Sequence, residues 1–189
     1  TGGFGAVYGG RISSIMDISS RDGNKKRFSG KVSSSPFGSK LMVEGPLKKL
    51  SEDGGSSISY VFSGKTSYLE QTSKILYPYI DSAGLPFNFT DLYGKVSING
   101  DNGSKVNFFG FNYNDQVKYK AVSDLNWNAW GVGTNFMVLP SSSPVLIMGK
   151  FNVSDYKISL AENDPNTGEE MAPRSSNVNG FNLGFDFKY

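Results

Sequence analysis

The sequence of 189 residues contains no histidine and no cysteine. A Ser-His-Asp triad, a thiol nucleophile and a zinc site of His and Cys ligands are therefore excluded. The acidic residues are scattered through predicted loops, where charged side chains are usually solvated. The composition predicts a protein that is not an enzyme and that uses no cofactor or metal ion.

A strong charge of one sign and long apolar runs are also lacking. Lys and Arg number 19 against 17 Asp and Glu, and this net charge of +2 does not indicate a nucleic-acid partner. The glycine-rich start TGGFGAVYGGR has the spacing of a kinase phosphate-binding loop, but no V-A-I-K or H-R-D segment follows it. No run approaches the roughly 20 apolar residues of a membrane-spanning helix, and the start does not have the pattern of a signal peptide.

Aromatic residues make up 14% of a chain that is nevertheless polar on average. This combination is found in soluble β-sandwiches and in outer-membrane barrels, which have one lipid-facing and one wet face. The composition leaves both classes open.

Apolar and polar residues alternate with a period of two along much of the chain. Near its end, Phe181, Leu183 and Phe185 share one face of a predicted strand, and Asn182 and Asp186 share the other. Such patterns predict eight strands, over residues 28–34, 39–45, 57–68, 91–99, 105–114, 125–139, 145–153 and 179–189. One short helix is predicted over residues 67–77, ended by Pro78.

The predicted connections between these strands differ in length. Residues 101–103 form a tight turn, because Asn-Gly favours the positive φ angles of a hairpin, and residues 140–144 form another. Longer loops are predicted over residues 67–90, 115–124 and 161–177. A meander with long loops at one end and short turns at the other is typical of an outer-membrane barrel. Alternation alone does not distinguish such a barrel from a soluble barrel with an apolar interior.

Two groups of side chains favour the membrane barrel. Charged residues stand in mid-strand on the predicted polar faces: Lys31, Lys40, Glu44, Lys65, Lys95, Lys150 and Asp186. A water-filled or plugged lumen would solvate them, and so would the outer surface of a soluble barrel. Aromatic residues toward the strand ends are candidates for interfacial girdles: Tyr68, Trp127, Trp130, Tyr156 and Tyr189.

The first quarter of the chain carries a dense motif. The stretch AVYGGRISSIMDISSRDGN, residues 6–24, is followed by Phe28-Ser29-Gly30 and by LMVEGPL, residues 41–47. These patterns closely resemble the junction of plug and barrel in TonB-dependent receptors of the Bacteroidetes type. The matching plug positions are Ala6, Tyr8, Gly9, Gly10, Arg11, Ser13, Ser14, Asp17, Ile18, Arg21 and Gly23. Farther along, only the strand alternation and the loop layout agree.

The resemblance implies an all-β fold: residues 1–26 would be the end of a plug domain, and residues 27–189 the first eight strands of a large transmembrane β-barrel. It implies a receptor that takes up an extracellular ligand across the outer membrane of a Gram-negative bacterium. Lipid would surround the barrel, TonB would act through plug residues outside this chain, and further strands or another chain would cover the open edges.

Two sets of candidate site residues follow. The resemblance implies plug–barrel contacts at Tyr8, Gly9, Gly10, Arg11 and Asp17, where glycines allow close approach of neighbouring chains. The long loops present aromatic side chains that are candidates for ligand binding: Tyr77, Tyr79, Phe87, Phe89 and Tyr119.

The alternative is a self-contained eight-stranded barrel, in a membrane or soluble, that binds a small ligand. Closure of such a barrel requires the last strand to pair with the first. The barrel-fragment interpretation predicts that residues 28–34 and 179–189 do not pair.

Overall fold

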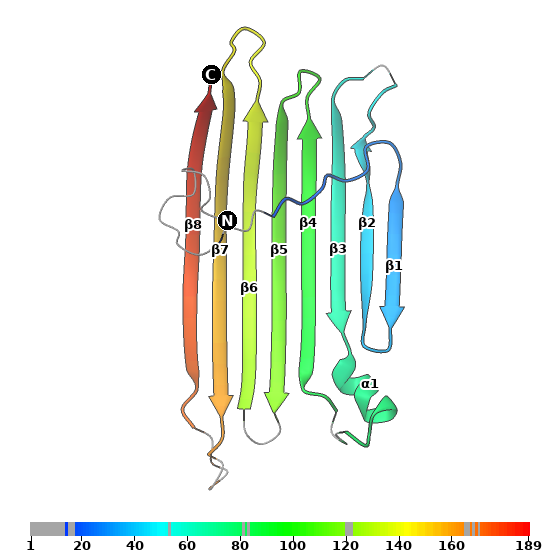
Figure 1. The fold of residues 1–189 in the computed structure, drawn as a ribbon, viewed down its shortest axis with the longest axis vertical. Coiled ribbons are helices and arrows are strands. Elements are labelled where there is room, and N and C mark those ends of the chain that lie inside the picture. Colours follow the sequence, from blue (N-terminus) through cyan, green and yellow to red (C-terminus); the bar gives the residue numbers. More distant parts are fainter. Residues whose placement is uncertain are drawn as a thin grey trace.

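The computed structural model describes residues 14, 18–52, 54–80, 82, 84–119, 123–164, 167, 169 and 171–189. They form one antiparallel sheet of eight strands, each hydrogen-bonded to the next in chain order (Figure 1). The elements are β1 (Ser29–Ser35), β2 (Gly38–Lys48), β3 (Ser57–Ser67), α1 (Leu69–Leu76), β4 (Phe87–Asn99), β5 (Lys105–Tyr119), β6 (Ser123–Val138), β7 (Leu146–Glu162) and β8 (Arg174–Lys188). The predicted eight-stranded meander is confirmed.

The short helix and the Asn-Gly turn that the local sequence predicts are confirmed as well. The helix α1 ends two residues before Pro78, as the missing N–H of proline requires. In the turn after β4, Gly103 has a φ of +87°, and the side chain of Asn102 accepts a hydrogen bond from the Ser104 N–H at 3.0 Å.

The predicted loop lengths are wrong at the end of the sheet that carries α1. The loop expected over residues 115–124 is reduced to residues 120–122, and the loop expected over residues 161–177 is reduced to residues 163–173. Polar residues on both faces give these strand ends the composition of loops, but ladder pairing continues to Tyr119↔Ser123. Long and short connections therefore share this end of the sheet.

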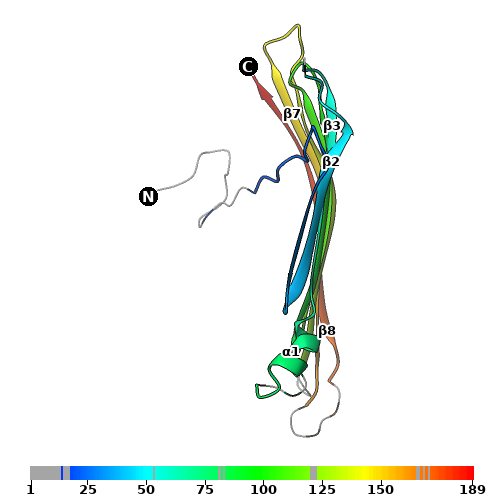
Figure 2. The ribbon, with the colours of Figure 1, turned by 90° about the vertical axis from the view of Figure 1, so that its right-hand side faces the viewer.

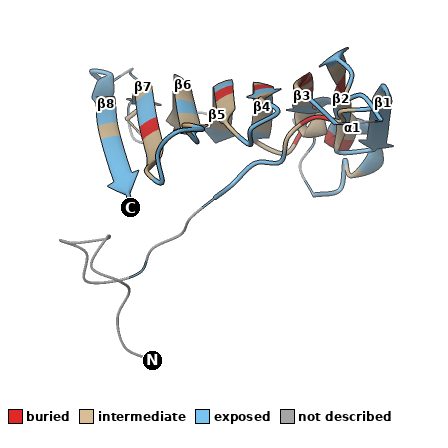
Figure 3. Ribbon diagram, turned by 90° about the horizontal axis from the view of Figure 1, so that it is seen from above, coloured by how far each residue is buried: buried red, intermediate tan, exposed pale blue. Residues whose placement is uncertain are grey.

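The sheet is open, with β1 and β8 as its two edges. The predicted absence of pairing between the first and last strands is confirmed. The self-contained barrel would need this pairing, so the described chain does not form a closed eight-stranded barrel (Figure 3).

The register divides the sheet into two faces, because residues directly opposite each other on neighbouring strands point the same way. One continuous row is Val61↔Lys95↔Phe109↔Gly133↔Asn152↔Asn182. We call the face of this row the polar face. The register puts all seven predicted mid-strand charges on it, namely Lys31, Lys40, Glu44, Lys65, Lys95, Lys150 and Asp186.

On the opposite face, here called the apolar face, large hydrophobic side chains are exposed. Exposed members are Val32, Leu41, Phe62, Leu92, Ile98, Phe108, Val132, Phe151, Phe181, Leu183, Phe185 and Phe187. On β6 the apolar band begins at Val138, includes Phe136 and Val132, and ends at Trp130, before the face turns polar at Asn128. Eight steps of about 3.3 Å make this band roughly 26 Å long, measured along the strand.

The buried side chains are mostly polar, whereas those buried in globular proteins are usually hydrophobic. In the described part of the chain, Val61 is the one buried hydrophobic residue. The buried polar or charged residues are Glu44, Ser57, Ser59, Ser67, Ser73, Lys95, Ser97 and Asn107. All of them except Ser73 of α1 lie on β2 to β5, whereas β1 and β8 are almost wholly exposed (Figure 3). The described sheet has no conventional apolar core.

The register also corrects the expected aromatic girdle. Trp130 lies on the apolar face, but Trp127 and Tyr156 point from the polar face. Side chains alternate between the two faces, and the register places Trp127 and Tyr156 on the face opposite to that of Trp130. Neither ring can therefore belong to a girdle on the apolar face.

On the polar face, the rings of Phe109 and Phe111 lie over glycines of β6, Gly133 and Gly131. A Cβ added at Gly133 would lie 2.7 Å from the ring of Phe109 and 2.9 Å from the backbone oxygen of Phe151. We expect Gly133→Ala to lower the free energy of unfolding by about 1–3 kcal/mol, because the neighbours must shift. Urea titration in detergent micelles measures this loss.

The matched control is Gly94→Ala on the apolar face, where an added Cβ would have its nearest neighbour at 3.9 Å, an atom of Phe62. This variant should be neutral or slightly stabilising, since it reduces the freedom of the unfolded chain. Equal effects of the two variants would contradict the packing argument.

Candidate functional site: the docked N-terminal segment

Residues 18–24 precede β1 and lie across the polar face of the sheet (Figure 2). The receiving side chains stand on β4 and β5. Tyr93, Lys95 and Ser97 follow one another at a spacing of two on β4, so that all three point toward the segment. Lys105 begins β5, directly after the turn.

Asp22 is the centre of the contact. Its Oδ1 accepts a hydrogen bond from Ser97 Oγ at 3.0 Å and lies 2.8 Å from Lys105 Nζ. Lys95 Nζ lies 3.2 Å from the same oxygen. One carboxylate thus makes charge-assisted hydrogen bonds with two ammonium groups and a hydroxyl of the sheet. The ammonium of Lys25, within the segment itself, lies 3.9 Å from the other oxygen of Asp22.

The environment keeps this carboxylate ionised. Burial by itself would raise the pKa of the Asp22 carboxyl. The hydrogen bonds from Lys105, Lys95 and Ser97 outweigh burial and hold the pKa of Asp22 below its ordinary value. A carboxyl in this state is a fixed charge and a poor proton acceptor, so the site is built for holding the segment.

Lys95 is the reciprocal anchor on the sheet. Its side chain is 7% exposed, and its ammonium also donates to the backbone carbonyl of Ser20 at 2.8 Å. The hydroxyl of Ser20 is hydrogen-bonded to the hydroxyl of Tyr93. A buried ammonium needs such partners, because an unpaired charge away from water is costly.

A second ion pair and a backbone contact extend the docking toward β2 and β3. Arg21 Nη2 lies 2.9 Å from Glu44 Oε1, and the Glu44 side chain is buried. A Cβ added at Gly23 would lie 1.9 Å from the backbone oxygen of Tyr60, so any side chain there would force the segment away. Glycine is required at this close approach.

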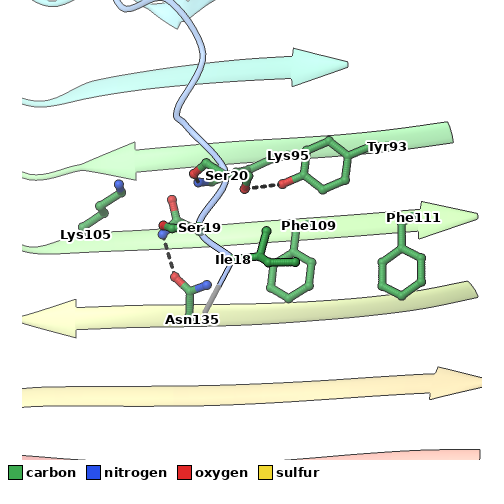
Figure 4. A pocket seen from close by; sticks show the side chains of 10 residues that line it. Ile18, Ser19, Ser20, Tyr93, Lys95, Lys105, Phe109, Phe111 and Asn135 are labelled. Atoms are coloured by element: carbon green, nitrogen blue, oxygen red, sulfur yellow. Dashed lines mark hydrogen bonds between the residues drawn. The ribbon is translucent and has the colours of Figure 1, made fainter. Parts of the chain in front are cut away.

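A cavity of about 370 Å³ lies beside the anchor, between residues 18–20 and strands β4, β5 and β6 (Figure 4). Lys95, Lys105 and the rings of Phe109 and Phe111 form its walls. The side chain of Asn135 closes it on β6 and accepts a hydrogen bond from Asn107 Nδ2 at 2.6 Å. Its walls combine cationic and amide groups with aromatic rings.

The expected plug–barrel residues Tyr8, Gly9, Gly10, Arg11 and Asp17 lie outside the described residues. Two other positions of the same motif, Arg21 and Gly23, contact the polar face of the sheet. The observed anchor, Asp22 with Lys95 and Lys105, was missed. The partners lie more than 70 residues from Asp22 in sequence, and only the position of Lys95 in mid-strand on the polar face indicated a role.

The expected ligand-binding aromatics divide into two groups near the α1 end. Tyr77 follows α1 and packs on Tyr79 with ring centroids 6.1 Å apart, and on Phe37 at 6.2 Å. The other group, Phe87, Phe89 and Tyr119, lies on β4 and β5. The register turns this second group toward the polar face.

Phe89 of the second group already has a partner. The ammonium of Lys65 lies 4.4 Å from the centroid of its ring, which is a cation–π contact. Phe87, Tyr119 and Tyr79 are exposed.

The described residues contain no group of three or more acidic side chains placed to hold a metal ion. None of the helices in the same part of the chain is long and apolar enough to cross a bilayer. Comparison of the chain with protein-family models, with curated proteins and with solved structures gives no match. The geometry of the anchor therefore has to carry the functional argument.

Docking of the N-terminal segment should depend on pH through Asp22. Because the docked pKa lies below the ordinary value of about 4, docking is fully favoured above that value and is lost as pH falls through the docked pKa. The chain has no cysteine, so a spin label at Ile18→Cys, an exposed position, reports on the segment alone. Its spectrum should stay unchanged from pH 7 down to about 4 and show a more mobile label as the pH falls further, through the docked pKa.

Asp22→Asn provides the control. It removes the charge while Arg21 and Glu44 remain, so the label should be mobile already at pH 7 and respond much less to pH. The loss of two charge-assisted contacts is expected to weaken docking by about 1.5–3 kcal/mol. An immobile label at pH 7 in this variant would contradict the anchor assignment.

Proposed function

We propose that the chain is part of a TonB-dependent outer-membrane receptor that takes up an extracellular ligand such as a metal chelate, a glycan or a peptide. Residues 1–26 would end the plug domain, and residues 27–189 would supply the first eight strands of the barrel. The observation that carries the proposal is a sheet with one exposed apolar face and one polar face on which the preceding segment is docked.

The apolar face supports a lipid environment. Its band runs roughly 26 Å along the strand, eight steps of about 3.3 Å. At the strand tilt of about 35–45° in outer-membrane barrels this corresponds to a height of about 18–21 Å, most of the approximately 25 Å apolar band of such barrels. Trp130 stands at the end of the band, where a bilayer would have its interface. Side chains such as Phe181 and Phe187, both 68% exposed, would gain about 25 cal/mol per Å² on leaving water.

The polar face supports a plugged lumen. Its lysines, serines and asparagines are typical of a barrel interior. The segment with Arg21 and Asp22 is held on this face by ion pairs, as a plug end held against the barrel wall would be. This agrees with the resemblance of the surrounding motif to the plug–barrel junction.

The open edges support the presence of further strands. The long edge strand β8 presents unpaired backbone groups and apolar side chains, which is a liability unless another strand covers it. In the proposed receptor the rest of the barrel pairs with β1 and β8, and TonB contacts a plug region outside this chain. No cofactor or nucleic acid takes part.

The apolar face should contact lipid only within the band. Val132 lies inside it, and Asn126 lies beyond Trp130 on the same face and strand. We expect a spin label at Val132→Cys in liposomes to be relaxed by oxygen, which concentrates in the bilayer. The label at Asn126→Cys should instead be relaxed by a water-soluble nickel chelate.

These two variants control for each other, because they share a strand, a face and the labelling chemistry. A label at Val132→Cys that prefers the nickel chelate would contradict the membrane location. The same preference at both sites would contradict a band that ends at Trp130.

The mass of the intact protein tests the receptor proposal more directly than the structure of the sheet does. A protein isolated from outer membranes with several times the 20.5 kDa of this chain is expected, since about 22 strands and a plug are needed. Intact mass spectrometry makes the measurement. A mass near 20.5 kDa would exclude the receptor.

A further inference from the structure

A second cavity on the polar face lies closer to the α1 end than the docked segment does. Its volume is about 410 Å³, and it is lined by Tyr113 and Asp115 of β5, Trp127 and Ala129 of β6, and Tyr156 of β7. It shares no lining residue with the cavity beside Asp22.

The register explains why a hollow forms there. Tyr113, Ala129 and Tyr156 stand directly opposite one another on three successive strands. The small methyl group of Ala129 lies between two large rings and forms the floor. The neighbouring row adds the pair Asp115↔Trp127, so rings and one carboxylate surround the floor.

The charge of the cavity is negative. The faces of Tyr and Trp rings carry negative electrostatic potential. Asp115 is the one charged side chain among the described residues that line the cavity, and no hydrogen bond or ion pair to another described residue engages it. The nearby cation Lys65 is directed to the ring of Phe89 and faces Asp91 across β3 and β4. Its charge reaches Asp115 through space without forming an ion pair, and the negative charge of Asp91 opposes it.

From this arrangement we infer that the cavity binds an organic cation, an ammonium group with an apolar body. Three electron-rich rings would surround the apolar body, and the carboxylate of Asp115 would neutralise the charge. A neutral ligand would leave the Asp115 carboxylate unpaired, and an anion would meet it directly. The site stands independently of the proposed function, because β5, β6 and β7 form it without further strands.

Choline and its uncharged isostere 3,3-dimethylbutan-1-ol are the probes for this site. They have the same shape and differ in charge, so their comparison separates cation recognition from burial of an apolar group. Ligand-observed NMR titration of the intact protein in detergent, against a protein-free detergent blank, measures both affinities. Tyr113, Tyr156 and Asp115 are exposed. Choline is therefore expected to bind about 2–5-fold more tightly than the isostere, the range of an exposed cation–π contact.

Variants locate the binding. Trp127→Leu and Asp115→Asn should each weaken choline binding about two- to fivefold, because each removes one attractive group. The matched controls are Trp130→Leu and Asp155→Asn, whose side chains stand opposite each other on β6 and β7 but on the apolar face. They should leave choline affinity unchanged.

Asp115→Asn is nearly isosteric, so it tests the site even where Trp127→Leu impairs folding. The assignment is overturned by absence of choline binding, by equal affinity for the two probes, or by equal effects of the polar-face and apolar-face variants. None of these outcomes bears on the barrel, which the mass and the spin-label experiments test separately.

Discussion

The strict alternation of side chains along hydrogen-bonded strands is the constraint on which the structure depends. A slip of one residue would move every side chain of a strand to the other face. The pairing from β3 to β8 keeps a continuous register, and the irregularity in the β2–β3 ladder falls between Pro46 and Lys48 at its end. All seven mid-strand charges therefore stay on one face. The apolar side chains have no interior to enter, so the surroundings of the sheet must accommodate them.

On the polar face, the docked segment supplies the partners that buried charged side chains need. Burying Lys95 under a chain segment would be unfavourable without an opposite charge. Asp22 provides that charge, and Lys105 and Ser97 complete its coordination. Gly23 permits the close backbone approach that this contact requires. Polar groups, in place of an apolar core, hold the two parts of the described chain together.

Period-two patterns were sufficient to predict the number and order of the strands, because local alternation reports directly on the two faces. They failed where the apolar face turns polar, as at Asn112 and Asn114 on β5, because hydropathy no longer alternates there although ladder pairing continues. The anchor of Asp22 was out of reach for a different reason. Its partners are brought to it by the pairing of distant strands, and no local pattern encodes that distance.

The two cavities are ordered along the same strand. Tyr113 lies four residues beyond Phe109 on β5, about 13 Å toward the α1 end. The ring of Phe111 lies between them and stacks on Tyr113 with centroids 5.0 Å apart. Phe109, Phe111 and Tyr113 thus follow one another on the polar face of β5, between the lysines that hold Asp22 and the acidic aromatic cavity. A ligand that approaches from the α1 end reaches the aromatic cavity before it reaches the docked segment, so binding and docking occupy successive levels of one polar surface.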